Sequence, residues 1–484
     1  MRDDLSIAYM SAETLVQAFQ RRELSPVEAY DSVRRVAQAR EPFINALAAV
    51  DDVGSRRLAL ASEHRWLRSS PLSELDGVPV TIKENIPQAG LFIGNGSASN
   101  RPVIAAKDGV AVERVKAAGM VPVGSTVMPD WGMLSSGVSS LHGITRSPRN
   151  LAWTTGGSSS GAAAACAAGY APINIGTDIG GSIRLPANWV GLAGLKPSHG
   201  RVPLDSPYLG RVAGPITRSV RDSALAMSVM SGADVRDYSS LPDQELAWTD
   251  LLWDPRGCRV GLLLDAGCGV AAESDVRDAV ENLAKALLTA GAIVEPMTPF
   301  MDPHLLASLD RLWRVRSWAD FCDLDTPNRD RVLPFVEAWC RAGSEVSGLE
   351  LMNSYHAIME IQRRTAAASA SFDLVISPVA RLPAFDAGWP MPYPELDTAM
   401  HHIGYTAPFS MSGQPAISVP SGQAEDGRPL GVQIAGERFA DLNVLRAAYW
   451  WEEAGPVTQD HTRLTEELVP SSWASFVGSR SRHE

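Results

Sequence analysis

Apolar and polar positions alternate with a helical period over much of the first 70 residues. The run Ser-Pro-Val-Glu at residues 25–28 carries the signals of a helix start. Ser25 can cap the free N–H groups of the first turn, Pro26 fits the first helical position, and Glu28 can return a hydrogen bond to the cap. We therefore expect the N-terminal part of the chain, about residues 1–70, to be a helical scaffold.

Further along, short β-branched runs alternate with helical patterns. Residues 77–82 predict a strand that ends at Lys83. Residues 108–118 predict an amphipathic helix that Gly119 ends, and residues 121–126 predict a second strand. Strands that alternate with helices favour a sheet covered by helices on both faces. The pattern thus predicts an α/β fold.

The middle of the chain, about residues 230–370, shows helical patterns without recognisable chemistry. Residues 304–320 and 349–371 carry apolar stripes, which indicate core packing rather than a cofactor site. Residues 372–378 then predict a buried strand. The last residues, 472–484, are expected to be frayed.

The composition is that of an ordinary globular protein, because 45% of the 484 residues are hydrophobic and 20% are charged. The formal net charge of −12 disfavours a nucleic-acid partner, which needs a basic face. The first residues lack an apolar signal core, and no apolar run is long enough to cross a bilayer. We therefore expect a cytoplasmic protein that contacts neither nucleic acid nor a membrane.

Metal and redox chemistry are not expected. The five cysteines form no Cys-x-x-Cys pair, which is typical of reduced structural thiols. His401 and His402 are adjacent, yet no further Asp, Glu or His stands at ligand spacing, so solvated loop histidines are expected. No cofactor and no metal are predicted.

Two loops rich in glycine and serine, at residues 156–161 and 176–184, are the candidate chemical centre. The first precedes an alanine-rich run that predicts a helix, and the second follows a short apolar run that predicts a buried strand. Successive amides in such glycine turns can bind an anion. Flexible turns and a phosphate cradle are the alternatives, but no Lys-Ser or Lys-Thr follows either loop. A lipase-type nucleophile elbow fits the letters at residues 157–161, yet the strand that should lead into it is absent.

A serine nucleophile in these loops needs a base, and Lys83 is a better candidate than a histidine. The reference pKa of lysine is about 10.4, and a charged ammonium group cannot accept a proton. Burial can lower the pKa of a lysine by several units, and Lys83 is flanked by apolar strand residues. A solvated charge at the end of a strand is the alternative interpretation.

Three segments together resemble the blocks of the amidase signature family, the Ser-cisSer-Lys amidohydrolases. They are Val-Thr-Ile-Lys-Glu-Asn at residues 80–85, Gly-Gly-Ser-Ser-Ser-Gly at residues 156–161, and Gly-Thr-Asp-Ile-Gly-Gly-Ser-Ile-Arg-Leu-Pro-Ala at residues 176–187. They occur in the order of the family, and residues 405–420 and 429–434 also resemble it. The resemblance implies the fold of that family, a large mixed central sheet covered by helices on both faces.

The resemblance also implies a role for each residue of the blocks. Ser182 is expected to attack the carbonyl carbon, and Ser158 is expected to relay the proton to neutral Lys83 and later protonate the departing amine. Asp178 and Arg184 are expected to hold the loop rather than react. The oxyanion is expected to be bound by backbone N–H groups of Ile179, Gly180, Gly181 and Ser182.

The loop at residues 127–134 is rich in large apolar groups, and the resemblance places it over the site. Met128 and Trp131 are the expected substrate contacts. Family members often carry an asparagine where this chain has Val127, which weighs against polar contacts at that position. An apolar wall favours aryl or alkyl amides, or aryl carbamates, over glutamine. Further expected wall residues are Met133, Trp313, Phe385 and Trp389.

The sequence thus predicts a hydrolase of carbon–nitrogen bonds other than peptide bonds, acting as a monomer or homodimer on a small amide or carbamate. Because the blocks must meet in one structure, we expect a single domain over residues 1–484, with a substrate-shaping segment at about residues 230–370. One alternative is a glutamine-amidotransferase A subunit that releases ammonia for partner subunits. A catalytically idle scaffold that binds an acyl compound is the other.

Overall fold

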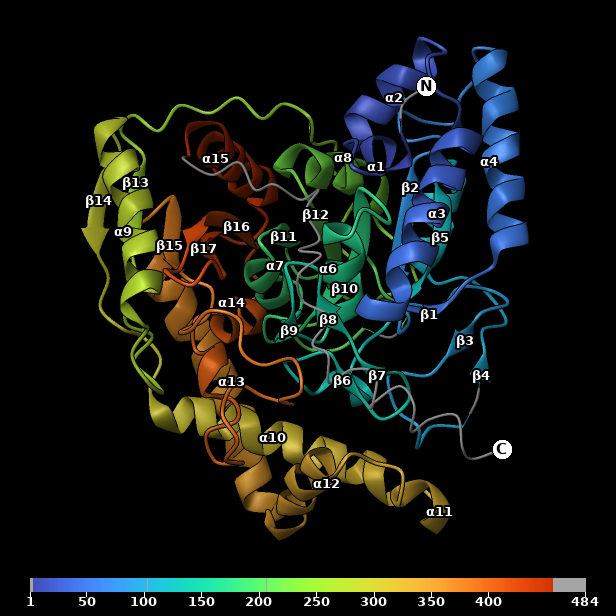
Figure 1. Cartoon of the computed structure of the whole chain (residues 1–484). Helices are drawn as coiled ribbons and strands as arrows, with labels where there is room; N and C mark the ends of the chain where they lie inside the picture. Colours follow the sequence, from blue (N-terminus) through green and yellow to red (C-terminus); the bar gives the residue numbers. More distant parts are fainter. Residues whose placement is uncertain (1–2, 102, 206, 456–484) are drawn as a thin grey trace.

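The computed structural model describes residues 3–101, 103–205 and 207–455, and it is built on one large mixed sheet (Figure 1). The predicted fraying of residues 472–484 lies outside these residues. Eleven of the described strands form the sheet, in the order β1-β5-β2-β10-β12-β11-β16-β17-β15-β13-β14. Their bounds are β1 Leu47–Ala49, β2 Pro79–Lys83, β5 Val121–Thr126, β10 Ile173–Asp178, β11 Ala193–Lys196, β12 Val212–Thr217, β13 Arg259–Leu262, β14 Ile293–Pro296, β15 Leu374–Pro378, β16 Ala416–Gln423 and β17 Pro429–Gly436. Three two-stranded ribbons lie outside it: β3 Phe92–Ile93 with β4 Val103–Ile104, β6 Val138–Ser139 with β7 Gly143–Ile144, and β8 Arg146–Ser147 with β9 Asn150–Thr154.

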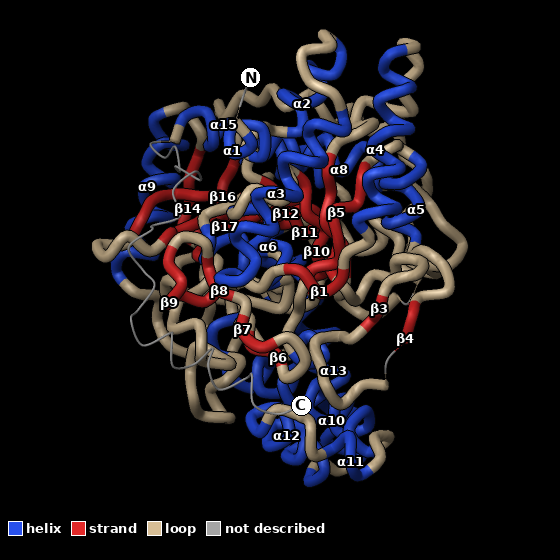
Figure 2. Tube along the Cα trace, turned by 45° about the vertical axis from the view of Figure 1, so that its right-hand side comes forward, coloured by secondary structure: helices blue, strands red, loops and turns tan. Residues whose placement is uncertain are grey.

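Helices cover the sheet on both faces, as predicted. The helices in chain order are α1 Asp4–Ala8, α2 Ala12–Gln20, α3 Pro26–Ile44, α4 Asp52–Leu67, α5 Val110–Ala117, α6 Ser160–Ala167, α7 Arg184–Val190, α8 Val220–Met230, α9 Ser274–Thr289, α10 Pro303–Cys322, α11 Thr326–Arg329, α12 Pro334–Arg341, α13 Gly348–Ser369, α14 Ala407–Met411 and α15 Asp441–Ala454. Helices α6 and α7 pack together against the middle strands, and α8 and α15 form another packed pair on the sheet. Figure 2 shows α10 to α13 gathered at one end of the molecule, away from the N-terminal helices.

Several elements begin and end where the sequence predicted. Helix α3 starts at Pro26 with a complete capping box between Ser25 and Glu28. Strand β2 ends at Lys83, and β5 covers residues 121–126. Neighbouring residues alone were enough to predict these elements, because the capping box forms hydrogen bonds within one helical turn and β-branched runs favour strands.

The parallel part of the sheet determines where the site lies. Strands β5, β2 and β10 are neighbours and run parallel, so their carboxyl ends meet at one edge. Lys83 is the last residue of β2, and Asp178 is the last residue of β10. Every residue of both strands is buried, which removes water from the surroundings of that edge.

Helix α6 packs against these strands at short range because its residues are small. All eight of its residues are buried. A Cβ atom on Gly161 would lie 2.3 Å from the backbone oxygen of Ala46 and 2.4 Å from the backbone nitrogen of Val127, so only glycine fits there. The close approach brings the loop that precedes α6, with Ser158, to the carboxyl edge of the sheet.

The middle segment forms both sheet and wall. Strands β13 and β14 extend the sheet, whereas α10, α12 and α13 pack together beyond its carboxyl edge (Figure 1). Strands from residue 47 to residue 436 share one sheet. The assignment of the whole chain to a single domain stays a prediction.

Candidate functional site

Two cavities meet at the glycine-rich loops. Ser182 lines a small chamber of about 50 Å³. Ser158 lines a larger cleft of about 650 Å³. Gly132, Ile179 and Arg316 line both, so the two spaces share a wall. The two serines that the sequence singled out therefore face neighbouring parts of one site.

Lys83 lies beneath this wall among hydroxyl groups. Its Nζ atom lies 2.8 Å from Oγ of Ser158 and 3.1 Å from both Oγ of Ser159 and Oγ1 of Thr177. The hydroxyl of Ser159 donates to the carbonyl oxygen of Thr177 at 3.2 Å, so its proton is already used. Of the three hydroxyls, Ser158 is the nearest, and its own proton can point to an unprotonated amine.

The surroundings of Lys83 favour its neutral form. The side chain is completely buried. Burial lowers the pKa of Lys83 to about 7, although the negative charges of Asp178 and Glu84 oppose the shift. Lys83 can therefore accept a proton near neutral pH, as the proposed role of a base requires.

The loop before α6 is tied to the loop after β10. The Gly157–Ser158 peptide bond is cis. The backbone N–H of Ser159 donates to the carbonyl oxygen of Ser182 at 3.2 Å. Register adds a further link, since Ile175 of β10 pairs with Ile82 of β2, and Thr177 reaches Lys83 from the next strand. The three predicted residues Lys83, Ser158 and Ser182 are thus brought to one edge of the sheet.

An ion pair buried within the loop shapes the turn that carries Ser182. The guanidinium of Arg184 donates to the carboxylate of Asp178 through Nη2 at 2.9 Å and Nε at 3.0 Å. Both side chains are inaccessible to solvent. Arg184 also donates to Ser410 Oγ and Gln433 Oε1, each at 2.7 Å. The C-terminal motif residues therefore serve to hold this loop, as expected for Asp178 and Arg184.

The peptide unit between Gly180 and Gly181 is fixed on both sides. Its carbonyl oxygen accepts from Thr406 Oγ1 at 2.6 Å, and its N–H, on Gly181, donates to Asp178 Oδ1 at 2.8 Å. Within the described part of the chain, the backbone N–H groups of Ile179 and Gly180 have no hydrogen-bond partner. Two free donors therefore remain beside Ser182, both on residues that line the chamber.

The loop expected over the site does lie there. Met128 and Trp131 line the cleft. Trp131 has φ +51°, a left-handed conformation that is uncommon for a large residue, and Gly132 follows with φ +71°. A carboxylate below the loop holds it, since Glu84 accepts from the backbone N–H of Met128 at 3.2 Å.

Helix α10 forms the opposite wall. Trp313 lines the chamber and packs over the loop that carries Ser182, since a Cβ atom on Gly180 would lie 3.0 Å from its ring. Met133 also lines the chamber. The expectation that Phe385 and Trp389, in the loop after β15, line the site is wrong, because neither residue lines these cavities. Phe385 is buried against Trp189, and Trp389 is 51% exposed.

The expectation of a solvated His402 is also wrong. Its side chain is fully buried, Nε2 lies 2.7 Å from Ser135 Oγ, and the ring stacks on Trp189. Burial lowers the pKa of His402 to about 3, so the ring is neutral. Apolar neighbours that the sequence could not place decide this burial.

These elements can be compared with known proteins. The family model for amidases matches residues 30–445. The chain belongs to the amidase signature family. The predicted enzyme class, a hydrolase of carbon–nitrogen bonds other than peptide bonds, is confirmed together with the family and the fold.

Among curated proteins, the chain is similar to the A subunit of the glutamyl-tRNA(Gln) amidotransferase of Bdellovibrio bacteriovorus. The two are 30% identical, and the alignment covers 95% of this chain and 100% of the relative. Among solved structures, it is similar to a bacterial aryl acylamidase of the amidase signature family, with a TM-score of 0.85, 27% identity, and 94% and 98% of the two chains covered. A 6-aminohexanoate cyclic dimer hydrolase gives a TM-score of 0.84 at 26% identity, with 94% and 99% covered.

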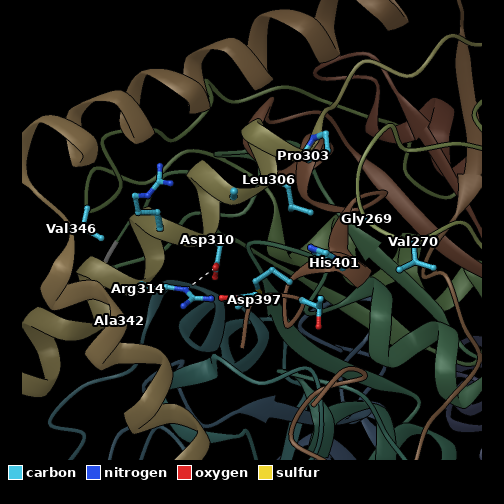
Figure 3. Close-up of a pocket in the computed structure, with 14 residues that line it drawn as sticks. Gly269, Val270, Pro303, Leu306, Asp310, Arg314, Ala342, Val346, Asp397 and His401 are labelled. Atoms are coloured by element: carbon cyan, nitrogen blue, oxygen red, sulfur yellow. Dashed lines mark hydrogen bonds and ion pairs between the residues drawn. The ribbon is translucent and has the colours of Figure 1, made fainter. Parts of the chain in front are cut away.

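In this amidase a third cavity, of about 660 Å³, lies against another face of α10 (Figure 3). Asp310 and Arg314 line it and form an ion pair at 2.7 Å. Met400 lines both this cavity and the chamber of Ser182. None of the three predicted catalytic residues lines it, so its size does not make it the reaction site.

Two negative findings apply to the described residues. Within residues 3–101, 103–205 and 207–455, no group of three or more His, Cys, Asp and Glu side chains could hold a metal ion. Over the same residues, no helix is both long and apolar enough to cross a membrane.

Sequence reasoning missed several polar residues of the site. Thr177 and Ser159 contact Lys83, and both stand inside the motif blocks. The position of Thr177 on β10, the parallel neighbour of β2, was an available signal. Asn85 follows Lys83, lines the cleft and donates to Thr177 Oγ1 at 3.1 Å. Arg316 carried no signal, because it stands on a helix whose pattern indicates only core packing.

Proposed function

We propose that this protein hydrolyses the C–N bond of a small amide or carbamate through an acyl-enzyme on Ser182. One observation carries the proposal: a buried lysine with a pKa near 7 lies 2.8 Å from the hydroxyl of Ser158, next to the chamber that Ser182 lines. A base that is partly neutral at physiological pH and a hydroxyl relay are the conditions that serine activation needs.

The proposed reaction forms an acyl-enzyme on Ser182 and then hydrolyses it. The Oγ atom of Ser182 bonds to the substrate carbon while its proton passes to Ser158, whose own proton passes to Nζ of Lys83. As the C–N bond breaks, Lys83 returns its proton to Ser158, and Ser158 donates one proton to the departing nitrogen. Water then attacks the acyl carbon and gives a proton to Lys83 through Ser158. The bond from the acyl carbon to Oγ of Ser182 breaks, Oγ regains a proton through the same relay, and the acid is released.

The negative charge of the tetrahedral intermediate needs donors near Ser182. We assign this role to the backbone N–H groups of Ile179 and Gly180, together with that of Ser182. Gly181, which sequence reasoning included, is left out of the proposed set because its N–H donates to Asp178. Removal of one such donor typically costs about 10²–10³-fold in rate.

The two spaces suit the two halves of a substrate. The chamber of Ser182 is lined by apolar side chains, among them Met133, Trp313 and Trp339. Its volume of about 50 Å³ has room for about three to five heavy atoms, since about 10–15 Å³ of such volume holds one water. We therefore place a short apolar acyl group in the chamber. The amine half belongs in the cleft, because Ser158, the proposed donor to the departing nitrogen, lines the cleft.

The amine half meets Met128 and Trp131, which is the proposed basis for turnover of aryl amides or aryl carbamates. Similarity to an aryl acylamidase supports this choice. We also propose that the protein acts in the cytoplasm, as a monomer or a homodimer, and that its natural substrate is a small amide or carbamate.

A fluorophosphonate probe tests the acyl-enzyme. We expect the probe to label the intact protein on Ser182 and to leave Ser182→Ala unlabelled, while thermal unfolding of the variant stays unchanged. Peptide mapping identifies the labelled serine. Labelling that persists at Ser158 in the variant would overturn the assignment.

A second candidate function is supported by the comparison with the amidotransferase relative, which matches 95% of the chain at 30% identity. A protein of that kind would release ammonia from glutamine for partner subunits. Comparing kcat/KM for acetanilide with kcat/KM for glutamine separates the two functions. A clear preference for glutamine, with two proteins co-purifying, would favour the amidotransferase.

A further inference from the structure

Two arginine side chains face the cleft from different elements. Arg211 directly precedes β12, and Arg316 lies on α10. Both line the cleft that Ser158 also lines, and Arg316 reaches the chamber of Ser182 as well. Two positive groups thus stand at the place where the amine half of a substrate is proposed to bind.

Among the described residues, Arg316 has no ion-pair partner within 4.0 Å. Its Nε atom is buried, and within the described residues it has no hydrogen-bond partner. The guanidinium instead lies 5.4 Å over the ring of Tyr208, a contact that fixes its plane but supplies no negative charge. Arg314, two positions earlier on the same helix, is paired with Asp310 at 2.7 Å. On the same helix, Arg314 therefore has a carboxylate partner, whereas Arg316 lines the cavities without one.

The two guanidinium groups also disfavour each other. Burial lowers the pKa of Arg211, and the positive charge of Arg316 lowers it further. Like charges held beside one cavity cost free energy, which an anion between them would offset. Planar guanidinium groups match the geometry of a carboxylate with two parallel hydrogen bonds.

The described carboxylates that line the cleft form no ion pair with Arg316. Asp205 lies 3.9 Å from the guanidinium of Arg236 and accepts from the backbone N–H of Val110. Asp323 is exposed. Burial raises the pKa of Asp320 and the positive charge of Arg316 lowers it, so the two groups interact without forming an ion pair within 4.0 Å. Of the described carboxylates, none forms an ion pair with Arg316 within 4.0 Å.

We propose that the preferred substrate is an N-acyl amine whose amine half carries a carboxylate, held by Arg316 and Arg211, while a short acyl group occupies the chamber of Ser182. N-acyl amino acids and acylaminobenzoates belong to this class. The inference rests on the proposed function. Such a substrate carries its carboxylate on the amine half, whereas glutamine carries its carboxylate on the acyl half.

Matched substrates test the inference in the unaltered protein. 4-Acetamidobenzoate and 4-methylacetanilide share the acetyl group and the ring, and they differ in one carboxylate. We expect kcat/KM to be about 10- to 100-fold higher for the carboxylate, as is typical of a charge-assisted hydrogen-bond pair. N-phenylsuccinamate, which carries its carboxylate on the acyl half, should gain nothing over acetanilide.

Variants locate the effect. Arg316→Met and Arg211→Met should each lower the ratio of kcat/KM for 4-acetamidobenzoate to kcat/KM for 4-methylacetanilide about 10- to 100-fold. Arg311→Met is the matched control, because Arg311 stands on α10 but lines the third cavity. It should change neither substrate.

The outcomes separate this inference from the proposed function. Equal turnover of the matched substrates by a protein that still labels on Ser182 would overturn the carboxylate and leave the acyl-enzyme intact. A preference for a substrate with a cationic amine half would overturn it in favour of the cleft carboxylates. Loss of all amide hydrolysis and labelling would overturn the proposed function itself. If a variant does not fold, the comparison of 4-acetamidobenzoate with 4-methylacetanilide in the unaltered protein still tests the carboxylate preference.

Discussion

Nζ of Lys83 lies 2.8 Å from Oγ of Ser158, and both side chains are shielded from bulk water. A lysine in water is charged at neutral pH and cannot accept a proton. Burial lowers the pKa of Lys83 to about 7, so part of the population is neutral at that pH. In the proposed mechanism, this contact couples the protonation of a buried amine to the reactivity of a serine in another loop.

The first prediction concerns pH. Because Lys83 accepts a proton only when neutral, and its pKa is lowered to about 7, kcat/KM should rise about tenfold per pH unit below pH 7 and level off above it. The rate is thus present above the lowered pKa and lost below it. A pH–rate profile with acetanilide measures this. Lys83→Met should lose the rate and the profile together, and a variant that keeps both would remove Lys83 from the mechanism.

The second prediction concerns the relay. Ser158→Ala should lower the rate of acylation by about 10²- to 10⁴-fold, the usual contribution of proton transfer by a positioned group. Stopped-flow release of nitroaniline from a nitroanilide measures it. Ser160→Ala is the control, because Ser160 is equally buried but donates to the backbone of Val127 and does not contact Lys83. Equal rates in the two variants would contradict the relay.

The third prediction concerns Gly132. It has φ +71°, and a Cβ atom there would lie 3.0 Å from Met128 Cε and 3.3 Å from Ser158 Oγ. Gly132→Ala should cost about 1–2 kcal/mol in the free energy of unfolding and also lower kcat by at least about tenfold, because Ser158 must move. Gly90 has φ +84° and no atom within 4 Å of a Cβ position, so Gly90→Ala should lower the free energy of unfolding and leave kcat unchanged. Urea unfolding and steady-state kinetics distinguish the two effects.

The fourth prediction concerns the buried ion pair. Asp178→Asn leaves the guanidinium of Arg184 without its counter-charge, which should lower the free energy of unfolding by about 3–5 kcal/mol. Asp254→Asn breaks an exposed pair with Arg256, which water screens, so it should leave the free energy of unfolding nearly unchanged. Denaturant titration of both variants tests the difference. Similar losses would mean that the Asp178 pair does not support the loop as the contacts indicate.

The sequence predicted the residues whose chemistry is local and missed those placed by distant contacts. Strand β2, the helix after Ser160 and the loop of Ser182 follow from runs of neighbouring residues. Thr406, Ser410 and Gln433, which hold that loop, act across more than 200 positions of the chain, and no local pattern predicts such contacts.

A low pKa alone would not have identified the base. Burial lowers the pKa of Lys196 to about 7 as well, yet that lysine donates to the carbonyl oxygen of Pro197 at 2.9 Å and lines none of the three cavities. Only the placement of Lys83 among the hydroxyls of the two loops separates the two lysines, and that placement requires the three-dimensional fold.

Helix α10 lines the chamber, the cleft and the third cavity, while Lys83, Ser158 and Ser182 all come from residues 79–184. The groups proposed to break the bond and much of the wall proposed to choose the substrate therefore lie on separate stretches of chain. Substitutions in this one helix can change which substrate such an enzyme accepts, while the residues of the proposed proton relay stay the same. A mutant library confined to the cavity-facing positions of α10 would sample new substrates at little risk to turnover.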